Sequence, residues 1–372
     1  MGLNKLVKIG SILAAFIMVI AFANTGFANT QDIYSVYNQT IDETADNEVL
    51  AKKQGLRNAK REAFYKVLKR LARQKDFGRF PQVDDVTIER MIRSTSLPSE
   101  KFSTGDGRYL AKLNVRFNAD NIRGVLRNAG IPYAEVQSRP LIVLPIYHIS
   151  GTTLLWEDGN QWFDAWTGLR LADELVPMVM PLGDITDVGT ISSLQASRSD
   201  ADKLAEIAQK YGVNGTLVTT ASLSIDPSSN APLADVFGVV QGQGWSTSDF
   251  HLSFVGESGM ATDVFLNQIA MATSAEVLAI WKQRNLLDFQ GGVQNLIVKA
   301  PLKNLNDWVV LRDRLNDVAG IRNVTLENLN MKEALVNIEF LGKSDQLQSA
   351  LAQNDLLLNY QLADSKWILT RK

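Results

Sequence analysis

The apolar positions of this chain change repeatedly between the period of a helix and the period of a strand. Apolar residues from Val49 to Leu71 recur on one helical face, which predicts a helix over residues 47–75 capped by Asp46. A strand over residues 33–41 precedes it, and a hairpin turning at Asp106-Gly107 follows. A shorter helix capped by Asn118 closes this region, so residues 29–138 are predicted to form an N-terminal α+β domain.

A continuous apolar run marks the start of the next region. Residues 140–146, bounded by two prolines, have the pattern of a buried strand. A helix capped by Ser199 and a strand over residues 216–220 follow, which is the order of a βαβ unit. An antiparallel strand pair and a long helix opening at Thr262 complete a predicted central α/β domain, residues 139–290.

The last region has a recognisable order of elements. Residues 291–372 predict strand, helix, two strands, helix and strand, which is the βαββαβ order of a ferredoxin-like domain. Trp367 to Leu369 are expected as an added strand at the edge of its sheet. The predicted fold class is therefore α+β and α/β, with three small mixed domains of which the last is ferredoxin-like.

The N-terminus has the pattern of an export signal. Lys5 and Lys8 precede an apolar run from Ile9 to Ala23, and Ala28 ends a small-residue cleavage motif. The run is shorter than the roughly 20 apolar residues that span a bilayer. Residues 1–28 are therefore predicted to be a signal peptide that is cleaved before Asn29, giving a periplasmic or secreted protein. An uncleaved N-terminal membrane anchor is the alternative.

Composition and charge narrow the class of protein. The chain has 372 residues, no cysteine and a formal net charge of −2, which becomes −4 once Lys5 and Lys8 are removed. This charge does not favour a nucleic-acid partner. The absence of cysteine excludes disulfides, thiol catalysis, thiolate metal sites and a lipid-modified N-terminus. Beyond the N-terminus, no second apolar run is expected to approach the length that spans a membrane.

The densest motif in the chain is aromatic and acidic. It forms a candidate binding patch made of Trp156, Glu157, Asp158, Asn160, Trp162, Asp164 and Trp166. Asn160 can cap a helix that puts Trp162 and Trp166 one turn apart on one face. Two interpretations remain open: an aromatic patch rimmed by acids that recognises a ligand, and a lid helix whose indoles pack into the core.

The first long helix is strongly basic. Its N-terminal half provides a candidate face for anionic surfaces, made of Lys52, Lys53, Arg57, Lys60 and Arg61. Lipid headgroups or acidic envelope polymers would fit such a face. The alternative is an ordinary solvated face whose long side chains cover apolar ground.

No catalytic, metal or cofactor motif is evident. His148 and His251 are the only histidines and lie in different segments, so a shared metal site is not expected. A triad of His251, Ser258 and Asp263 lacks the glycine pattern of a nucleophile elbow. Gly242 and Gly244 lack the third glycine of a dinucleotide site, and no cofactor is predicted.

Two segments carry a resemblance to known families. Arg139 to Ile146 followed by the motif from Trp156 to Trp166, with the exported start and the Asn58-Ala63 helix, resembles an uncharacterised proteobacterial exported family defined only as a domain of unknown function (number 2066). More weakly, the helix–strand unit from Ser199 to Thr220 resembles the N-terminal domain of the periplasmic protein TolB. The first family implies no activity, and the second likeness concerns fold alone.

Three functional hypotheses follow from these patterns. The first is a non-enzymatic envelope protein that binds or scaffolds an envelope protein or polymer. The second is a hydrolase that acts on an envelope polymer through the acids near Trp156 to Trp166. The third is a peripheral protein that meets a membrane surface through the basic helix over residues 49–75. The pattern does not indicate an oligomeric state.

Overall fold

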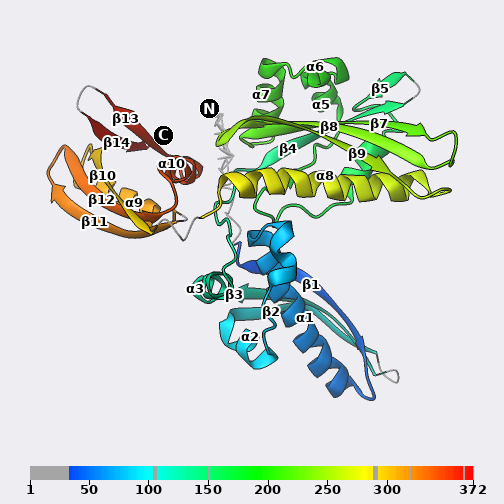
Figure 1. The fold of residues 1–372 in the computed structure, drawn as a ribbon, viewed down its shortest axis with the longest axis horizontal. Helices are drawn as coiled ribbons and strands as arrows, with labels where there is room; N and C mark the ends of the chain where they lie inside the picture. The colour runs from blue at the N-terminus through cyan, green and yellow to red at the C-terminus, as the bar shows by residue number, and fades with distance from the viewer. Residues whose placement is uncertain are drawn as a thin grey trace, which may run out of the picture. The chain divides into compact units, whose positions relative to one another are not determined.

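The structure is a computed structural model that describes residues 33–103, 107–149, 151–287, 292–318, 320–362 and 365–371. The predicted signal peptide and part of the predicted hairpin turn lie outside the described residues. Figure 1 shows three β-sheets, each associated with helices. The predicted mixed α+β class is confirmed.

The first sheet has three antiparallel strands in the order β1-β3-β2. Its region contains β1 (Ser35–Thr44), α1 (Glu48–Leu71), η1 (Gln74–Arg79), α2 (Asp85–Met91), β2 (Ile92–Ser103), β3 (Arg108–Phe117) and α3 (Ala119–Asn128). Helix α1 packs on this sheet through a face that includes Ala59, Ala63 and Val67. The cap of α1 is Asn47, one residue after the predicted Asp46, because the Asn47 side chain accepts a hydrogen bond from the Leu50 amide.

The central sheet has a parallel pair at its heart and an antiparallel extension. It is built from β4 (Leu141–Ile149), β5 (Thr152–Leu154), β6 (Met178–Val179), β7 (Gly215–Ile225), β8 (Pro232–Gly242) and β9 (Trp245–Val255). The strand order is β5-β4-β7-β8-β9, with β6 paired to β4 beside this path. Strands β4 and β7 are parallel, and helix α7 (Ala201–Lys210) lies between them in sequence, as predicted for a βαβ unit.

Helices cover the two faces of the central sheet unequally. They are α4 (Gln161–Thr167), α5 (Ile185–Thr190), α6 (Ser193–Ser197), α7 (Ala201–Lys210) and α8 (Thr262–Arg284). Figure 1 shows α8 along one face and α5, α6 and α7 on the other. Val143 and Tyr147 of β4 join the core under α8, while Ile142 and Leu144 join the core under α7. Strand β4 is therefore buried on both faces, which explains its continuous apolar run.

The predicted cap of α7 is displaced by one residue. Asp200, not Ser199, accepts a hydrogen bond from the Lys203 amide at the start of the helix. Ser199 instead has a φ of 54°, a left-handed backbone conformation, and lies between the end of α6 and the start of α7. Both residue types suit an N-cap, so the pattern located the helix start without choosing between neighbours.

Helix α8 is the one helix of the described residues that has the length and composition to cross a membrane, with a mean hydropathy of 1.3. The sequence pattern did not lead us to expect such a segment. Its apolar residues include Phe265, Ile269 and Val277, which are buried against the central sheet and α4. This burial accounts for its apolar composition, because a core helix needs an apolar face.

The C-terminal region contains the predicted βαββαβ order, followed by one more strand. Its elements are β10 (Val293–Pro301), α9 (Leu305–Asn316), β11 (Ile321–Leu329), β12 (Glu333–Leu341), α10 (Ser344–Gln353), β13 (Leu356–Gln361) and β14 (Lys366–Arg371). The expectation that residues 367–369 form an edge strand is wrong. The sheet order is β11-β12-β10-β14-β13, so β14 lies inside the sheet.

The position of β14 results from pairing on both sides. Val298 and Lys299 of β10 pair in parallel with Trp367 and Ile368. On its other side β14 forms an antiparallel hairpin with β13, in which Asn359 is opposite Ile368. The second strand of the β13–β14 hairpin is therefore the one that pairs with β10, and β13 lies at the edge of the sheet.

A buried lysine links α8 to the end of α1. The ammonium of Lys282 donates hydrogen bonds to the carbonyl oxygens of Lys69 and Ala72, at 2.8 and 2.9 Å. Lys282 is only 7% exposed, and this burial lowers its pKa to about 8. The carbonyls at a helix C-terminus have no partners within the helix, so the ammonium satisfies groups that α1 itself cannot.

The inserted position of β14 predicts the effect of truncation. We expect a chain that ends after Leu362 to lose the ordered pairing of β13, because β13 pairs with β14, whereas β10 keeps its pairing with β12. Amide exchange of β13 measures this loss, with β7 as the internal control. Native protection of β13 in the truncated chain would contradict the strand order.

The lowered pKa of Lys282 predicts a rise in stability with pH. Between about pH 8 and pH 10 the unfolded chain holds more protons at this lysine than the folded chain, so the free energy of unfolding should rise. The slope attributable to this group is at most about 1.4 kcal/mol per pH unit. Urea unfolding of the parent and of Lys282→Met at several pH values isolates it. A difference between the two proteins that does not change over this window would contradict the assignment.

Candidate functional site

The aromatic motif is largely part of the core. Trp162 and Trp166, on α4, are 0% and 1% exposed, and their rings meet edge to face with centroids 5.7 Å apart. The indole nitrogen of Trp162 donates a hydrogen bond to the Thr219 hydroxyl of β7 at 3.0 Å. Their burial favours the interpretation of α4 as a lid helix over that of an exposed aromatic patch.

The remaining residues of this motif shape the turn before α4. The Asn160 side chain caps the helix, because its oxygen accepts from the Phe163 amide, and its nitrogen donates to the carbonyl of Pro145. Trp156 is partly buried, and its indole nitrogen donates to the Ile191 carbonyl at 2.7 Å. These contacts give Asn160 and Trp156 structural roles.

The acids of the motif do not form a catalytic pair. Glu157 accepts hydrogen bonds from the backbone amides of Leu155 and Trp156, at 2.7 and 3.1 Å. Asp158 and Asp164 are exposed on the surface. A general acid and base must both lie within reach of one substrate, whereas the Glu157 carboxylate is bound to the backbone of its own turn.

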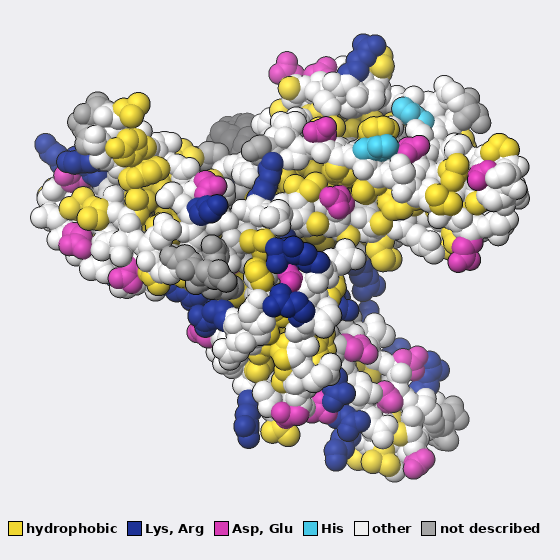
Figure 2. Space-filling view, in the orientation of Figure 1, with side chains coloured by type: hydrophobic (Ala, Val, Ile, Leu, Met, Phe, Trp, Pro, Cys, Tyr) yellow, Lys and Arg dark blue, Asp and Glu magenta, His cyan; other side chains and the backbone are white. Residues whose placement is uncertain are grey.

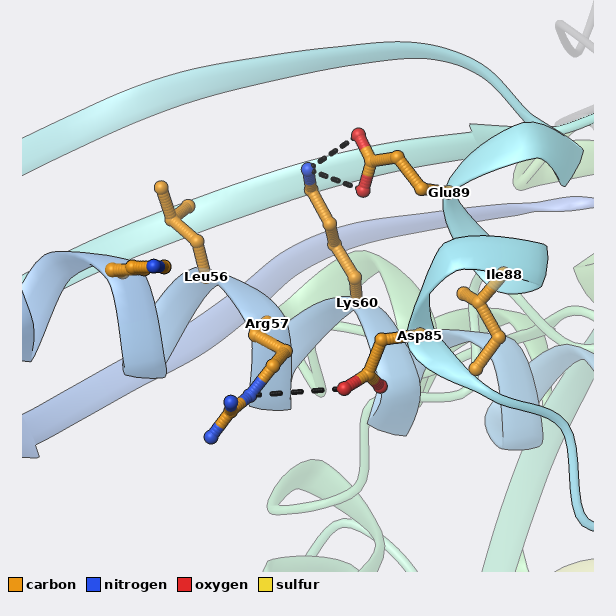
Figure 3. A pocket seen from close by; sticks show the side chains of 7 residues that line it. Leu56, Arg57, Lys60, Asp85, Ile88 and Glu89 are labelled. Atoms are coloured by element: carbon orange, nitrogen blue, oxygen red, sulfur yellow. Dashed lines mark hydrogen bonds and ion pairs between the residues drawn. The ribbon is translucent and has the colours of Figure 1, made fainter.

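The basic face of α1 is mostly neutralised by acids of the same region. Lys60 contacts Glu89 at 2.8 Å, and Arg57 and Arg61 contact Asp85 at 3.8 and 2.5 Å. Figure 3 shows Lys60 and Arg57 of α1 reaching these carboxylates of α2.

Lys52 is paired as well, with Glu100 of β2 at 2.6 Å. Lys53 makes no ion pair with the described side chains. Lys53, Leu56 and Ile88 line, with the paired charges, a groove of about 250 Å³ between α1 and α2. Four of the five predicted cations are thus engaged within the protein, which reduces the attraction of this face for an anionic surface.

The central sheet brings together residues that the sequence analysis treated as unrelated. His148 of β4 is in register with Ser222 of β7, and Ser222 is in register with Asp235 of β8. His251 of β9 is in register with Phe237 of β8. Figure 2 shows histidine side chains close together on one face of the molecule. Both histidines therefore lie on the sheet face that α7 only partly covers.

An aromatic and acidic cluster occupies this face on β8 and β9. The rings of Phe237 and His251 are stacked, with centroids 4.2 Å apart and planes 5° from parallel. Asp235 contacts the Nε2 atom of His251 at 3.0 Å and accepts a hydrogen bond from the Ser253 hydroxyl at 2.7 Å. The Ser253 hydroxyl, and after it the His251 imidazole, hold the pKa of Asp235 below its usual value.

Exposure distinguishes this cluster from the aromatic motif. Phe237 is 54% exposed although it lies in the middle of an 11-residue strand. We name Asp235, Phe237, His251 and Ser253 the sheet-face cluster. It offers a flat apolar ring together with donors and acceptors of hydrogen bonds, which is the chemistry of a recognition surface.

The sheet-face cluster is not arranged for metal binding or acyl transfer. The described residues contain no group of three potential metal ligands among His, Cys, Asp and Glu. The Ser253 hydroxyl contacts Asp235 and not His251, so the imidazole is not placed to take a proton from it. The members of the cluster come together through the register of the β8–β9 hairpin, in which Asp235 lies opposite Ser253 and Phe237 opposite His251.

Comparison with known proteins gives no family. No family model and no curated protein matches the chain. Among solved structures, this chain is similar to a variant of PelC from Paraburkholderia phytofirmans, described as a dodecamer, at 12% identity and a TM-score of 0.24. The likeness covers 39% of this chain and 89% of PelC, and at this score it supports no inference.

The burial of Trp162 predicts a large loss of stability on truncation. We expect Trp162→Ala to lower the free energy of unfolding by about 3–5 kcal/mol, because a large cavity remains beside α8. Chemical denaturation measures the change, and Asp158→Ala on the exposed turn is the control. Equal unfolding midpoints for the two variants would contradict the packing role.

Proposed function

We propose that this chain is an exported, non-enzymatic binding or scaffold module that contacts an envelope protein or polymer. The observation that carries the proposal is the sheet-face cluster, in which Phe237 stands 54% exposed and stacked on His251. Export rests on the signal pattern of residues 1–28, and the proposed domain division follows the three sheets.

Energetics support a role in recognition for Phe237. An exposed aromatic ring gains only part of the transfer free energy that a buried one contributes to folding. Its neighbours Asp235 and Ser253 are polar and exposed, so Phe237 does not belong to a core on this face. Large aromatic residues are enriched where partners bind, since their flat rings bury much area at little entropic cost.

The two alternatives have weaker support. A hydrolase acting through Glu157, Asp158 and Asp164 would need convergent carboxylates, whereas Glu157 is bound to backbone amides. A peripheral membrane protein would need free cations on α1, whereas Lys60 and Arg61 already contact carboxylates of α2.

The test is site-specific photo-crosslinking in the living cell. A photoreactive phenylalanine analogue at position 237 keeps an aromatic ring at the proposed contact. We expect it to form a covalent adduct with an envelope component. The control places the same analogue at Val264, which is 45% exposed on α8, on the opposite face of the sheet.

Two outcomes would contradict this proposal. One is the absence of any adduct at position 237 in a folded, exported protein. The other is an equal yield of the same adduct at position 264, which would indicate contact without a preferred surface.

A further inference from the structure

Most sheet edges of this protein carry features that oppose pairing with another chain. Unpaired edge strands expose a row of amides and carbonyls, and natural proteins protect them with bulges, prolines, lysines or short length. Strand β1 has a register shift between Val36 and Gln39, and β11 has two register shifts. Strand β2 has two register shifts and also contains Pro98 and Lys101. Strand β5 is only three residues long.

Strand β9 is an edge without such protection. It has 11 residues, contains no proline and no lysine, and pairs with β8 alone in the described part of the chain. Its register with β8 runs without interruption from Ser248 to Val255, and the one shift lies beside the turn, between Val240 and Gly242. A long and regular edge of this kind is a ready template for a further strand.

The apolar side of this edge is also incompletely covered. Phe250, Leu252 and Phe254 pack against the core under α8 but remain partly exposed. Phe250 is held in place because Gly238 lies directly beneath it, where an added Cβ would come within 2.0 Å of the ring. A strand added beside β9 would extend this apolar surface and cover these side chains further.

We propose that β9 pairs with β9 of a second copy of this chain, antiparallel and about a twofold axis at Phe250. Phe250 is the midpoint of β9, so this register alone pairs the strand along its whole length, from Trp245 to Val255. Residues directly opposite each other lie on the same side of an antiparallel sheet, so the surface under α8 continues from one copy to the next.

Charge complementarity selects the same register. With the axis at Phe250, Asp249 lies opposite His251 of the partner subunit, and the pair occurs twice. Asp249 is exposed and makes no ion pair with the described side chains. His251 contacts Asp235 through Nε2, which leaves Nδ1 on the other side of its ring. In the imidazolium form of His251, Nδ1–H would donate to the carboxylate of Asp249 of the partner subunit, and such a pair directly across two strands stabilises them.

Neighbouring registers lack this match. With the axis at Asp249, the two carboxylates would lie opposite each other, and with the axis at His251, the two imidazoles would do so. Like charges directly opposite each other, such as the two carboxylates, are unfavourable. If the partner strand were shifted by one residue, its side chains would exchange faces of the sheet. Phe250 would then lie opposite a polar residue of the partner strand.

The proposed pairing would join the outer faces of two copies into one surface. Each sheet-face cluster lies on β8 and β9, next to the axis, so the two clusters would be neighbours. This inference does not depend on the proposed function, since it concerns the edge of the sheet and a partner of known sequence.

Sedimentation equilibrium over a range of concentrations tests the proposal with Asp249→Lys. Lysine at this edge position would face His251 of the partner subunit and would also protect the edge. We expect the parent protein to dimerise and Asp249→Lys to dimerise at least ten-fold more weakly. The control Glu257→Lys makes the same change of charge just beyond β9 and should match the parent.

A mixing experiment tests the register itself. His251→Glu would set two carboxylates opposite each other in its own dimer, whereas mixed with Asp249→Lys it would form two complementary pairs. We expect each variant to be mostly monomeric and the mixture to be dimeric, with circular dichroism verifying that both are folded. A monomeric parent at all concentrations, or an Asp249→Lys variant as dimeric as the parent, would overturn the proposal.

Discussion

The last turn of α8 provides the contacts on which the arrangement of the first two sheets depends. The indole nitrogen of Trp281 donates to the Val136 carbonyl at 2.6 Å, and its ring lies 4.7 Å from that of Trp245. The next residue, Lys282, donates to two carbonyls at the end of α1. A buried ammonium without hydrogen-bond acceptors is strongly unfavourable. The contact is therefore stabilising only because the end of α1 places two carbonyl oxygens beside Lys282. Helix α8 thus connects the central sheet to the N-terminal region through buried hydrogen bonds.

The charge balance of this junction reinforces the constraint. Arg70 is buried on α1 and donates to the carbonyls of Ile33 and Ser35, while its guanidinium lies 3.8 Å from Glu174. Glu174 raises the pKa of Lys282 and Arg70 lowers it, although burial has the largest effect. One carboxylate thus serves two buried cations, and removing one member of such a group typically costs about 3–5 kcal/mol. Desolvated polar groups therefore contribute to holding this junction together.

The sequence predicted local elements better than their partners in space. The helix predicted over residues 47–75, which the structure has at Glu48–Leu71, and the helix after Asn160 follow from period and capping, which are properties of neighbouring residues. The place of β14 between β10 and β13 depends on pairing between distant strands, and no local pattern encodes it. The same reason hid the shared face of the two histidines, since His148 and His251 lie on one face only through the register of four strands. The basic face of α1 was visible as a run of cations, but its neutralisation by Asp85 and Glu89 required the fold of α2.

The contrast between two aromatic groups shows where function is to be sought. Trp162 and Trp166 belong to the most conspicuous motif in the sequence, and their rings are buried in the core. Phe237 has no notable sequence context, yet it remains exposed among polar residues on a face that α7 leaves open. A ring that contributes little to folding is free to contribute to binding, because its transfer from water is still to be gained. The unprotected edge of β9 lies beside this ring, so the same two strands offer both a surface and an edge to partners.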